Sequence, residues 1–261
     1  MKVSCIQLNM KICDVQANFA HAVELIHDTV KKEKSDVVVL PETWSTGYYP
    51  KEIMSFCEAD GVQSKRTFSL LAKELNVNIV AGSVVTLKNG KVYNTAYIFN
   101  RQGELAGEYD KTHLFTPMGE QKLFEYGKKP VTFGLDGHKC GIAVCYDIRF
   151  PEFIRTLALE GIEMLFVVSQ WPDKRIEHLK TLAAARAIEN QMFVAVCNSC
   201  GEAEDTRFGG NSGIIDPWGN LLAAAGENEE IITADCDFTV IRTIRSSIDV
   251  FNDRKPEIYI L

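Results

Sequence analysis

Hydrophobic and polar positions follow two different periods along the chain, and the two periods alternate. Val3–Leu8 is a short apolar run typical of a strand, whereas apolar residues recur at helical spacing from Phe19 to Val30. Asp14 precedes that helix and is its expected N-cap. The all-apolar run Val37–Leu40 is typical of a strand buried on both faces. The first cycle of the pattern therefore predicts an α/β fold.

The same alternation continues to about residue 220. An irregular stretch from 41 to 61 precedes a helix around Phe68–Leu75. Ile79–Val85 and Val92–Phe99 flank Asn89-Gly90, which predicts a β-hairpin and hence a mixed sheet. The second half predicts strand Gly141–Cys145, helix Glu152–Leu159, strand Met164–Val168, helix Lys174–Asn190, strand Met192–Cys197 and a hairpin at Asp216–Asn220.

The 261 residues contain no Pro/Gly/Ser-rich linker, low-complexity tract or repeat. We therefore expect residues 1–261 to form a single domain. No apolar run approaches the roughly 18 residues that a membrane helix needs, and the polar residues after Met1 predict no secretory signal. The expected location is the cytosol. The tail from about 249 to 261 mixes charged and apolar residues, so we expect it to dock on a partner subunit.

Charge and cysteine usage narrow the function classes. Lys and Arg number 28 against 35 Asp and Glu, a net charge of −7 without a basic block, which argues against a nucleic-acid partner. The eight cysteines are scattered, and a cytosolic protein of this size needs no disulfides. Most of them are interpreted as reduced core residues.

One cysteine stands where a nucleophile would be expected. Cys145 ends an apolar strand, and Pro151 followed by Glu152 is typical of a helix start. A helix N-terminus carries partial positive charge, so this position favours a thiolate. The alternative is that Cys145 is a small buried hydrophobic residue.

Two further strand ends carry an ionisable residue. Glu42 follows Val37–Leu40, and Lys111 follows the segment Glu104–Tyr109. In α/β sheets ligands gather at the carboxyl ends of strands, although either residue alone is also typical of a solvated surface charge. His113 lies in the same segment as Lys111. On spacing alone, a Cys145–His113 dyad competes with a Cys145–Glu42 pair.

Three segments of the chain are more specific than these positions. In order and spacing they resemble the signature blocks of the nitrilase (carbon–nitrogen hydrolase) superfamily, and the resemblance covers nearly the whole chain. The segments are Leu40-Pro41-Glu42-Thr43, Asp110-Lys111-Thr112-His113-Leu114-Phe115 and Cys145-Tyr146-Asp147-Ile148-Arg149-Phe150-Pro151-Glu152. The resemblance implies a four-layer αββα sandwich of mixed sheets flanked by helices, and a homodimer joined through those helices and the C-terminal tail.

The resemblance also implies the roles of the site residues. Glu42 would be the general base, Lys111 the oxyanion stabiliser and Cys145 the nucleophile, with the backbone N–H of Tyr146 as a second oxyanion donor. A second family glutamate falls on Glu120, with Glu125 as the neighbour that a small misalignment would choose. His113 would then be a structural group. This chemistry requires no metal and no cofactor.

The segments 170–175 and 185–191 resemble the ω-amidase branch, which hydrolyses the side-chain amide of 2-oxoglutaramate or 2-oxosuccinamate. Trp171 would wall the pocket, and Arg175 would meet a substrate carboxylate. Arg149 and Arg186 are interpreted as structural partners of nearby acidic residues. These acidic residues are Asp147, Glu152 and Glu189. The same triad acting on a deaminated peptide amide, an N-carbamoyl amino acid or a nitrile is the alternative.

Two rival functions belong to other classes. Cys197 and Cys200 have the spacing of a redox or zinc half-site, but no second Cys/His pair accompanies them. A non-catalytic binding member of the family is the other rival, and the presence of Glu42, Lys111 and Cys145 argues against it. Rapid alkylation of Cys145 alone would favour the amidase.

Overall fold

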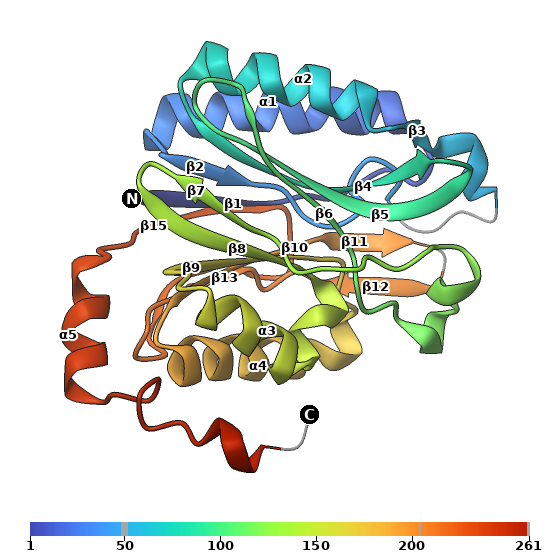
Figure 1. Ribbon diagram of the computed structural model, residues 1–261. Coiled ribbons are helices and arrows are strands. Elements are labelled where there is room, and N and C mark those ends of the chain that lie inside the picture. The colour runs from blue at the N-terminus through green and yellow to red at the C-terminus, as the bar shows by residue number, and fades with distance from the viewer. Residues whose placement is uncertain (48–51, 204, 260–261) are drawn as a thin grey trace.

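Two large β-sheets packed face to face form the centre of the molecule, and helices cover their outer faces (Figure 1). This arrangement holds for residues 1–47, 52–203 and 205–259, which the computed structural model describes. It is the four-layer α/β sandwich that the sequence predicts, so the expected fold class is confirmed. Searched over the same residues, no helix is long and apolar enough to cross a membrane.

The first sheet combines the strands of the N-terminal half with the last strand of the chain. The described strands lie in the order β15 (Glu230–Asp235), β1 (Lys2–Gln7), β2 (Val37–Val39), β4 (Asn78–Lys88), β5 (Lys91–Phe99) and β6 (Leu105–Asp110), with β3 (Glu58–Ala59) paired to β4. β1, β2 and β4 are parallel to one another, whereas β15 pairs antiparallel to β1. The first and last strands of the chain therefore lie side by side. Helices α1 (Val15–Glu33) and α2 (Val62–Leu75) cover the outer face (Figure 1).

The second sheet is built from the C-terminal half. Its described strands lie in the order β14 (Leu221–Ala224), β13 (Gly213–Ile215), β10 (Phe193–Asn198), β9 (Met164–Ser169), β8 (His138–Val144) and β7 (Thr132–Leu135). Helices α3 (Pro151–Leu159) and α4 (Ile176–Asn190) cover its outer face (Figure 1). The remaining elements are the hairpin β11 (Cys200–Ala203) and β12 (Thr206–Gly209), helix α5 (Thr239–Ser247), and the 3₁₀ turns η1 (Ile53–Phe56), η2 (Thr116–Met118), η3 (Glu120–Lys122), η4 (Cys145–Arg149), η5 (Asp173–Arg175) and η6 (Pro256–Ile258).

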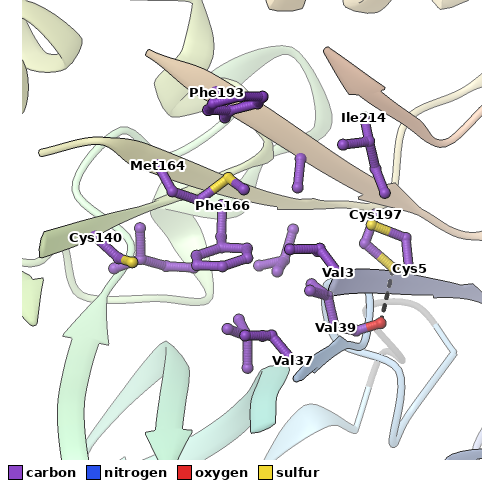
Figure 2. Packing of buried hydrophobic residues seen from close by; sticks show 14 of the residues in the cluster. Val3, Cys5, Val37, Val39, Cys140, Met164, Phe166, Phe193, Cys197 and Ile214 are labelled. Carbon is purple, nitrogen blue, oxygen red and sulfur yellow. Dashed lines mark hydrogen bonds between the residues drawn. The ribbon is translucent and has the colours of Figure 1, made fainter. Parts of the chain in front are cut away.

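Apolar side chains from both sheets fill the space between them. Val3 and Val39 from the first sheet and Phe166 and Phe193 from the second belong to one buried cluster, and each is at most 2% exposed (Figure 2). Because the opposite faces of the same strands lie under helices, these strands are buried on both sides. That burial explains the uninterrupted apolar runs from which the strands are predicted.

Local signals identify the early elements correctly. The Asp14 side chain accepts a hydrogen bond from the Ala17 amide and caps α1. Asn89 and Gly90 both have positive φ angles, 50° and 75°, as a two-residue hairpin turn requires. The stretch expected to be irregular contains η1 and β3, and its residues 48–51 lie outside the described residues. Strands β7, β11, β12 and β15 and helix α5 are additions that the sequence pattern does not predict.

The C-terminal segment turns back under the α3–α4 layer (Figure 1). The guanidinium groups of Arg155 and Arg245 lie 5.5 and 5.0 Å from the centre of the Phe251 ring. The Gln191 side chain donates a hydrogen bond to the Ile248 carbonyl at 2.6 Å. The start of the tail therefore docks on its own subunit, and its last two residues, 260 and 261, lie outside the described residues.

Candidate active site

Three of the expected site residues follow strands that end at one edge of the sandwich. Glu42 comes after β2, Lys111 directly after β6 and Cys145 directly after β8. The Lys111 Nζ lies 2.9 Å from Glu42 Oε1 and 2.9 Å from Glu120 Oε1. Lys111, Glu42 and Glu120 are each at most 2% exposed. The fold thus brings the predicted cation and both predicted glutamates into one buried cluster.

A bulge in the neighbouring strand shapes the turn that carries Glu42. The register between β4 and β5 shifts between Val80 and Ser83, and Gly82 within this bulge has a φ of +61°. The Ser83 amide donates to the Pro41 carbonyl at 3.1 Å, and the Ser83 hydroxyl accepts from the Thr43 amide at 3.0 Å. Ser83 therefore holds the chain on both sides of Glu42.

Two further donors hold the Glu42 carboxylate itself. Asn94 Nδ2 donates to Glu42 Oε1 at 2.8 Å, and the backbone N–H of Gln170 donates to Glu42 Oε2 at 2.9 Å. The Gln170 side chain in turn donates to the Gly47 carbonyl and accepts from the Thr43 hydroxyl. Because these contacts come from both sheets, the orientation of the carboxylate depends on the packing of the whole sandwich.

Lys111 is fixed through both its backbone and its ammonium group. Its backbone N–H donates to the Asn94 carbonyl and its own carbonyl accepts from Gly127, each at 2.9 Å. Burial alone would lower the pKa of Lys111, but the charges of Glu42 and Glu120 outweigh it and raise the pKa above its ordinary value. The side chain is therefore a buried ammonium that stays charged.

The structure distinguishes the two candidate second glutamates by position. Glu120 begins η3, and its Oε2 accepts a hydrogen bond from the Phe115 amide at 2.8 Å while the carboxylate also contacts Lys111. Glu125 pairs instead with Lys91 at the surface. Glu120 is thus the neighbour of Lys111, as the alignment of the motif implies.

Cys145 opens η4 with a φ of +49°, a left-handed conformation that is strained for a residue other than glycine. Burial of the thiol raises its pKa well above the ordinary value, and the Glu42 charge adds to that rise although Lys111 opposes it. The expectation that the helix start favours a thiolate is therefore wrong, because burial and a neighbouring carboxylate outweigh a single short turn. The thiol needs a base to remove its proton.

His113 has a different partner from the one that a dyad requires. Its Nδ1 lies 2.7 Å from Asp147 Oδ1, and its ring stacks on Phe150 with centroids 3.7 Å apart. Asp147 is fully buried and also accepts from the Tyr109 hydroxyl at 2.7 Å. These contacts agree with the structural role that the resemblance implies for His113.

The buried cluster opens into a small pocket. The pocket contains all three residues expected to bind substrate, Tyr146, Trp171 and Arg175. Trp171 is 3% exposed and donates its indole N–H to the Arg175 carbonyl, so it is both a core residue and a pocket wall. The lining residues are Glu42, Phe115, Met118, Glu120, Cys145, Tyr146, Arg149, Gln170, Trp171, Pro172 and Arg175.

Arg149 corrects the sequence-based interpretation. It forms no ion pair with a carboxylate of the described residues; its guanidinium lies 4.7 Å from the centre of the Trp171 ring and contacts His178. The interpretation of Arg149 as an ion-pair partner is wrong, because η4 turns the side chain into the pocket. Arg186 does pair with Glu189, at 2.8 Å, as expected.

A second guanidinium lies in the same pocket. Arg175 lies 5.3 Å from the centre of the Phe115 ring, and within the described chain it likewise has no carboxylate partner. Two guanidinium groups held against aromatic rings suit an anionic ligand group.

Sequence reasoning did not assign Asn94, Gln170 or Phe115 to the site. Asn94 gives the one usable signal, since it is a polar residue within the apolar run Val92–Phe99. Gln170 and Phe115 contact the carboxylates of Glu42 and Glu120 through backbone N–H groups, which any residue type except proline provides. Spacing in the sequence cannot reveal such contacts.

Cys197 and Cys200 do not form an accessible dithiol. Both are buried and reduced, and the Cys197 thiol donates to the carbonyls of Ile6 and Val39 in the core between the sheets. Burial raises the pKa of Cys200 to about 12. These surroundings argue against the redox alternative.

Comparison with known proteins adds to this geometry. Residues 2–246 match the family described as carbon-nitrogen hydrolase. The chain is 42% identical to the 2-oxoglutaramate amidase of Bacillus subtilis (strain 168), over 98% of each chain, and 36% identical to the hydrolase in the agr operon of Staphylococcus aureus, over 99% and 100%. It superposes with a TM-score of 0.91 on Saccharomyces cerevisiae Nit3, described as a member of branch 10 of the nitrilase superfamily, with 30% identity and coverage of 99% and 97%.

Proposed function

Because this chain belongs to the carbon–nitrogen hydrolase family, we propose that it is an ω-amidase that releases ammonia from 2-oxoglutaramate or 2-oxosuccinamate. The observation that carries the proposal is the pair of guanidinium groups, Arg149 and Arg175, in the pocket that also contains Glu42 and Cys145. The name of the Bacillus relative supports the same substrate class.

The first half of the reaction forms a thioester. Glu42 takes the Cys145 proton while the sulfur attacks the amide carbonyl, which explains how a thiol with a raised pKa becomes a nucleophile. The negative charge that develops on the carbonyl oxygen is stabilised by the Lys111 ammonium and the backbone N–H of Tyr146. The protonated Glu42 then gives its proton to the departing ammonia.

The second half returns the enzyme to its starting state. Glu42, again ionised, removes a proton from a water molecule that attacks the thioester carbonyl. The carbon–sulfur bond breaks and Glu42 gives the proton it took from water to the Cys145 sulfur. The new carboxylic acid loses its remaining proton to solvent, and the dicarboxylate product leaves. Glu120 holds the Lys111 ammonium throughout, consistent with their 2.9 Å contact.

The pocket favours a keto acid over an amino acid. The substrate carboxylate pairs with Arg175 and Arg149, and the short chain places the distal amide at Cys145. An α-ammonium group would instead have to leave water beside two guanidinium groups and Lys111. Trp171 forms the wall of the pocket and limits the length of the substrate.

Turnover of a substrate panel tests the proposal. We expect kcat/KM for 2-oxoglutaramate or 2-oxosuccinamate to exceed that for glutamine or asparagine by orders of magnitude, and the Cys145→Ala variant to fold but to release no ammonia. A preference for an N-carbamoyl amino acid, a nitrile or a deaminated peptide amide would move the protein to another branch. More than a tenth of wild-type turnover in Cys145→Ala would overturn the nucleophile.

The same proposal extends to the state of the molecule. Residues 1–261 form one domain that acts as a cytoplasmic homodimer, joined through the outer faces of the helices on the second sheet and the C-terminal tail. Exposed apolar side chains on this side support the dimer. They include Ile188, Trp218, Leu221 and Ile258.

A further inference from the structure

Asn94 touches two parts of the site, and the mechanism above gives it no role. It lies on β5 and is 1% exposed. Its Nδ2 donates to Glu42 Oε1 at 2.8 Å, while its backbone carbonyl accepts the Lys111 N–H at 2.9 Å. One residue therefore contacts the carboxylate directly and also fixes the chain that carries the ammonium.

Hydrogen bonds reach both oxygens of the Glu42 carboxylate. Oε1 accepts from Asn94 Nδ2 and Lys111 Nζ, and Oε2 accepts from the Gln170 amide. Rotation of the carboxylate would break the two contacts of Oε1 together. Asn94 and Lys111 thus hold Oε1 in place.

We propose that Asn94 is the positioning residue of the general base: its amide holds the Glu42 carboxylate in the orientation in which it accepts the Cys145 proton. The inference rests on the proposed function, in which Glu42 is the base. An N–H donor stabilises a carboxylate more than it stabilises the neutral acid. Without Asn94, Glu42 binds a proton more readily, and the enzyme loses its base at a higher pH.

A second observation shows that this amide is not explained by packing. Asn94 Oδ1 is buried and accepts no hydrogen bond from the described residues. A buried carbonyl oxygen without a donor destabilises the fold, and an aliphatic side chain of similar size would avoid that cost. The contact of Nδ2 with Glu42 accounts for an amide at this position.

The charged and titratable groups around Glu42 come from several elements. They are Lys111 after β6, Glu120 on η3, Cys145 on η4 and, along the pocket, Arg149 and Arg175. The substitution Asn94→Leu changes none of these groups, so a shift in the pH dependence of that variant reports the loss of the amide. Asn94→Asp also loses the amide N–H donor and adds a carboxylate beside Glu42.

The test compares Asn94→Leu and Asn94→Asp with the wild-type protein. The readouts are the pH profile of kcat/KM and the pH profile of Cys145 alkylation by iodoacetamide. In Asn94→Leu we expect the acidic limb of both profiles to shift to higher pH by about one unit, with activity recovering at high pH. Asn94→Asp should move it further, because a second carboxylate then faces Glu42.

Asn190→Leu is the matched control. Asn190 is equally buried, its Oδ1 also lacks a donor within the described chain, and its Nδ2 contacts the Glu189 carboxylate away from the site. This variant should be less stable than the wild-type protein, but the acidic limb of its two pH profiles should lie at the wild-type pH. The inference would be overturned if the acidic limb of Asn94→Leu lay at the wild-type pH, or if Asn190→Leu showed the same shift.

Two features of the design keep the result decisive. The alkylation profile does not depend on which amide is the substrate, so a failed substrate assignment leaves this test intact. Asn94→Asp has nearly the same shape as the wild-type residue and carries the test if Asn94→Leu does not fold. Wild-type profiles in a folded Asn94→Asp protein would also overturn the inference.

Discussion

At the scale of single residues, the site is a cluster of buried charges, and each charge is stabilised there by its oppositely charged neighbour. Lys111 lies between the carboxylates of Glu42 and Glu120, and all three are buried. Removing one member leaves uncompensated charge in a medium of low polarity. The cluster therefore contributes to folding as well as to chemistry, and the two contributions need separate measurements.

Replacement of Lys111 by methionine separates these contributions. We expect kcat to fall by about 10²–10³-fold, roughly 3–4 kcal/mol, because the ammonium acts on charge that develops in the transition state. The free energy of unfolding should also fall, by about 3–5 kcal/mol, because two carboxylates lose their cation. Steady-state kinetics and urea unfolding measure the two effects.

A surface lysine provides the control for Lys111→Met. Lys91 pairs with Glu125 at the surface, and Lys91→Met should change neither quantity by much. If Lys111→Met raised KM and left kcat level, the ammonium would be a substrate anchor and not an oxyanion stabiliser.

At the scale of elements, strand ends and one bulge decide where the reactive atoms lie. A Cβ on Gly82 would come within 2.0 Å of the Pro41 carbonyl and 2.8 Å of the Trp44 ring. The residue after Pro41 is Glu42. The bulge in β4 is thus in direct contact with the turn that carries the proposed base.

Gly82→Ala should therefore damage activity from a position outside the pocket. We expect a loss of stability of about 1–3 kcal/mol from backbone strain and a fall in kcat of about 10²-fold from displacement of Glu42. Thermal unfolding and turnover measure both. Gly134→Ala on β7 is the control, because open space surrounds that position. Equal turnover in the two variants would contradict this role of the bulge.

Helices, strands and turns that depend on neighbouring residues can be predicted from the sequence. Those that depend on contacts with distant segments cannot. The hairpin at Asn89-Gly90 and the Asp14 cap depend on neighbouring residues, so the sequence identifies them. β15 and α5 carry weaker patterns and gain their order from contacts with distant segments. In the site, the resemblance to the nitrilase superfamily pointed to Glu42, Lys111, Glu120 and Cys145, whereas the orientation of Arg149 depends on tertiary packing.

At the scale of the whole molecule, the outer face on the side of the second sheet carries exposed apolar side chains next to one another. On the side of the second sheet, Ile188 of α4 and Leu221 of β14 are 52% and 58% exposed. The space beside Gly219 is filled by the Ile188 side chain, so the turn between β13 and β14 packs on α4. These residues form one apolar surface, suited to a second copy of the chain.

We expect the wild-type protein to sediment as a dimer and the double variant Ile188→Glu/Leu221→Glu to sediment as a monomer, because two buried charges would oppose association. Leu70→Glu is the control: Leu70 is 61% exposed on α2, on the opposite side of the sandwich. Sedimentation velocity distinguishes the species. A monomeric wild-type protein, or dissociation by Leu70→Glu, would contradict this interface.

The antiparallel pairing of β1 with β15 separates, in the order of synthesis, the catalytic groups from a strand that completes their fold. Lys2 of β1 lies opposite Asp235 of β15. β1 can therefore form this pairing only after β15 has been translated. The residues proposed for catalysis, from Glu42 to Cys145, all leave the ribosome long before that partner. Contacts so distant in sequence form late in folding. Every residue proposed for catalysis is therefore translated before the strand that completes the pairing of β1.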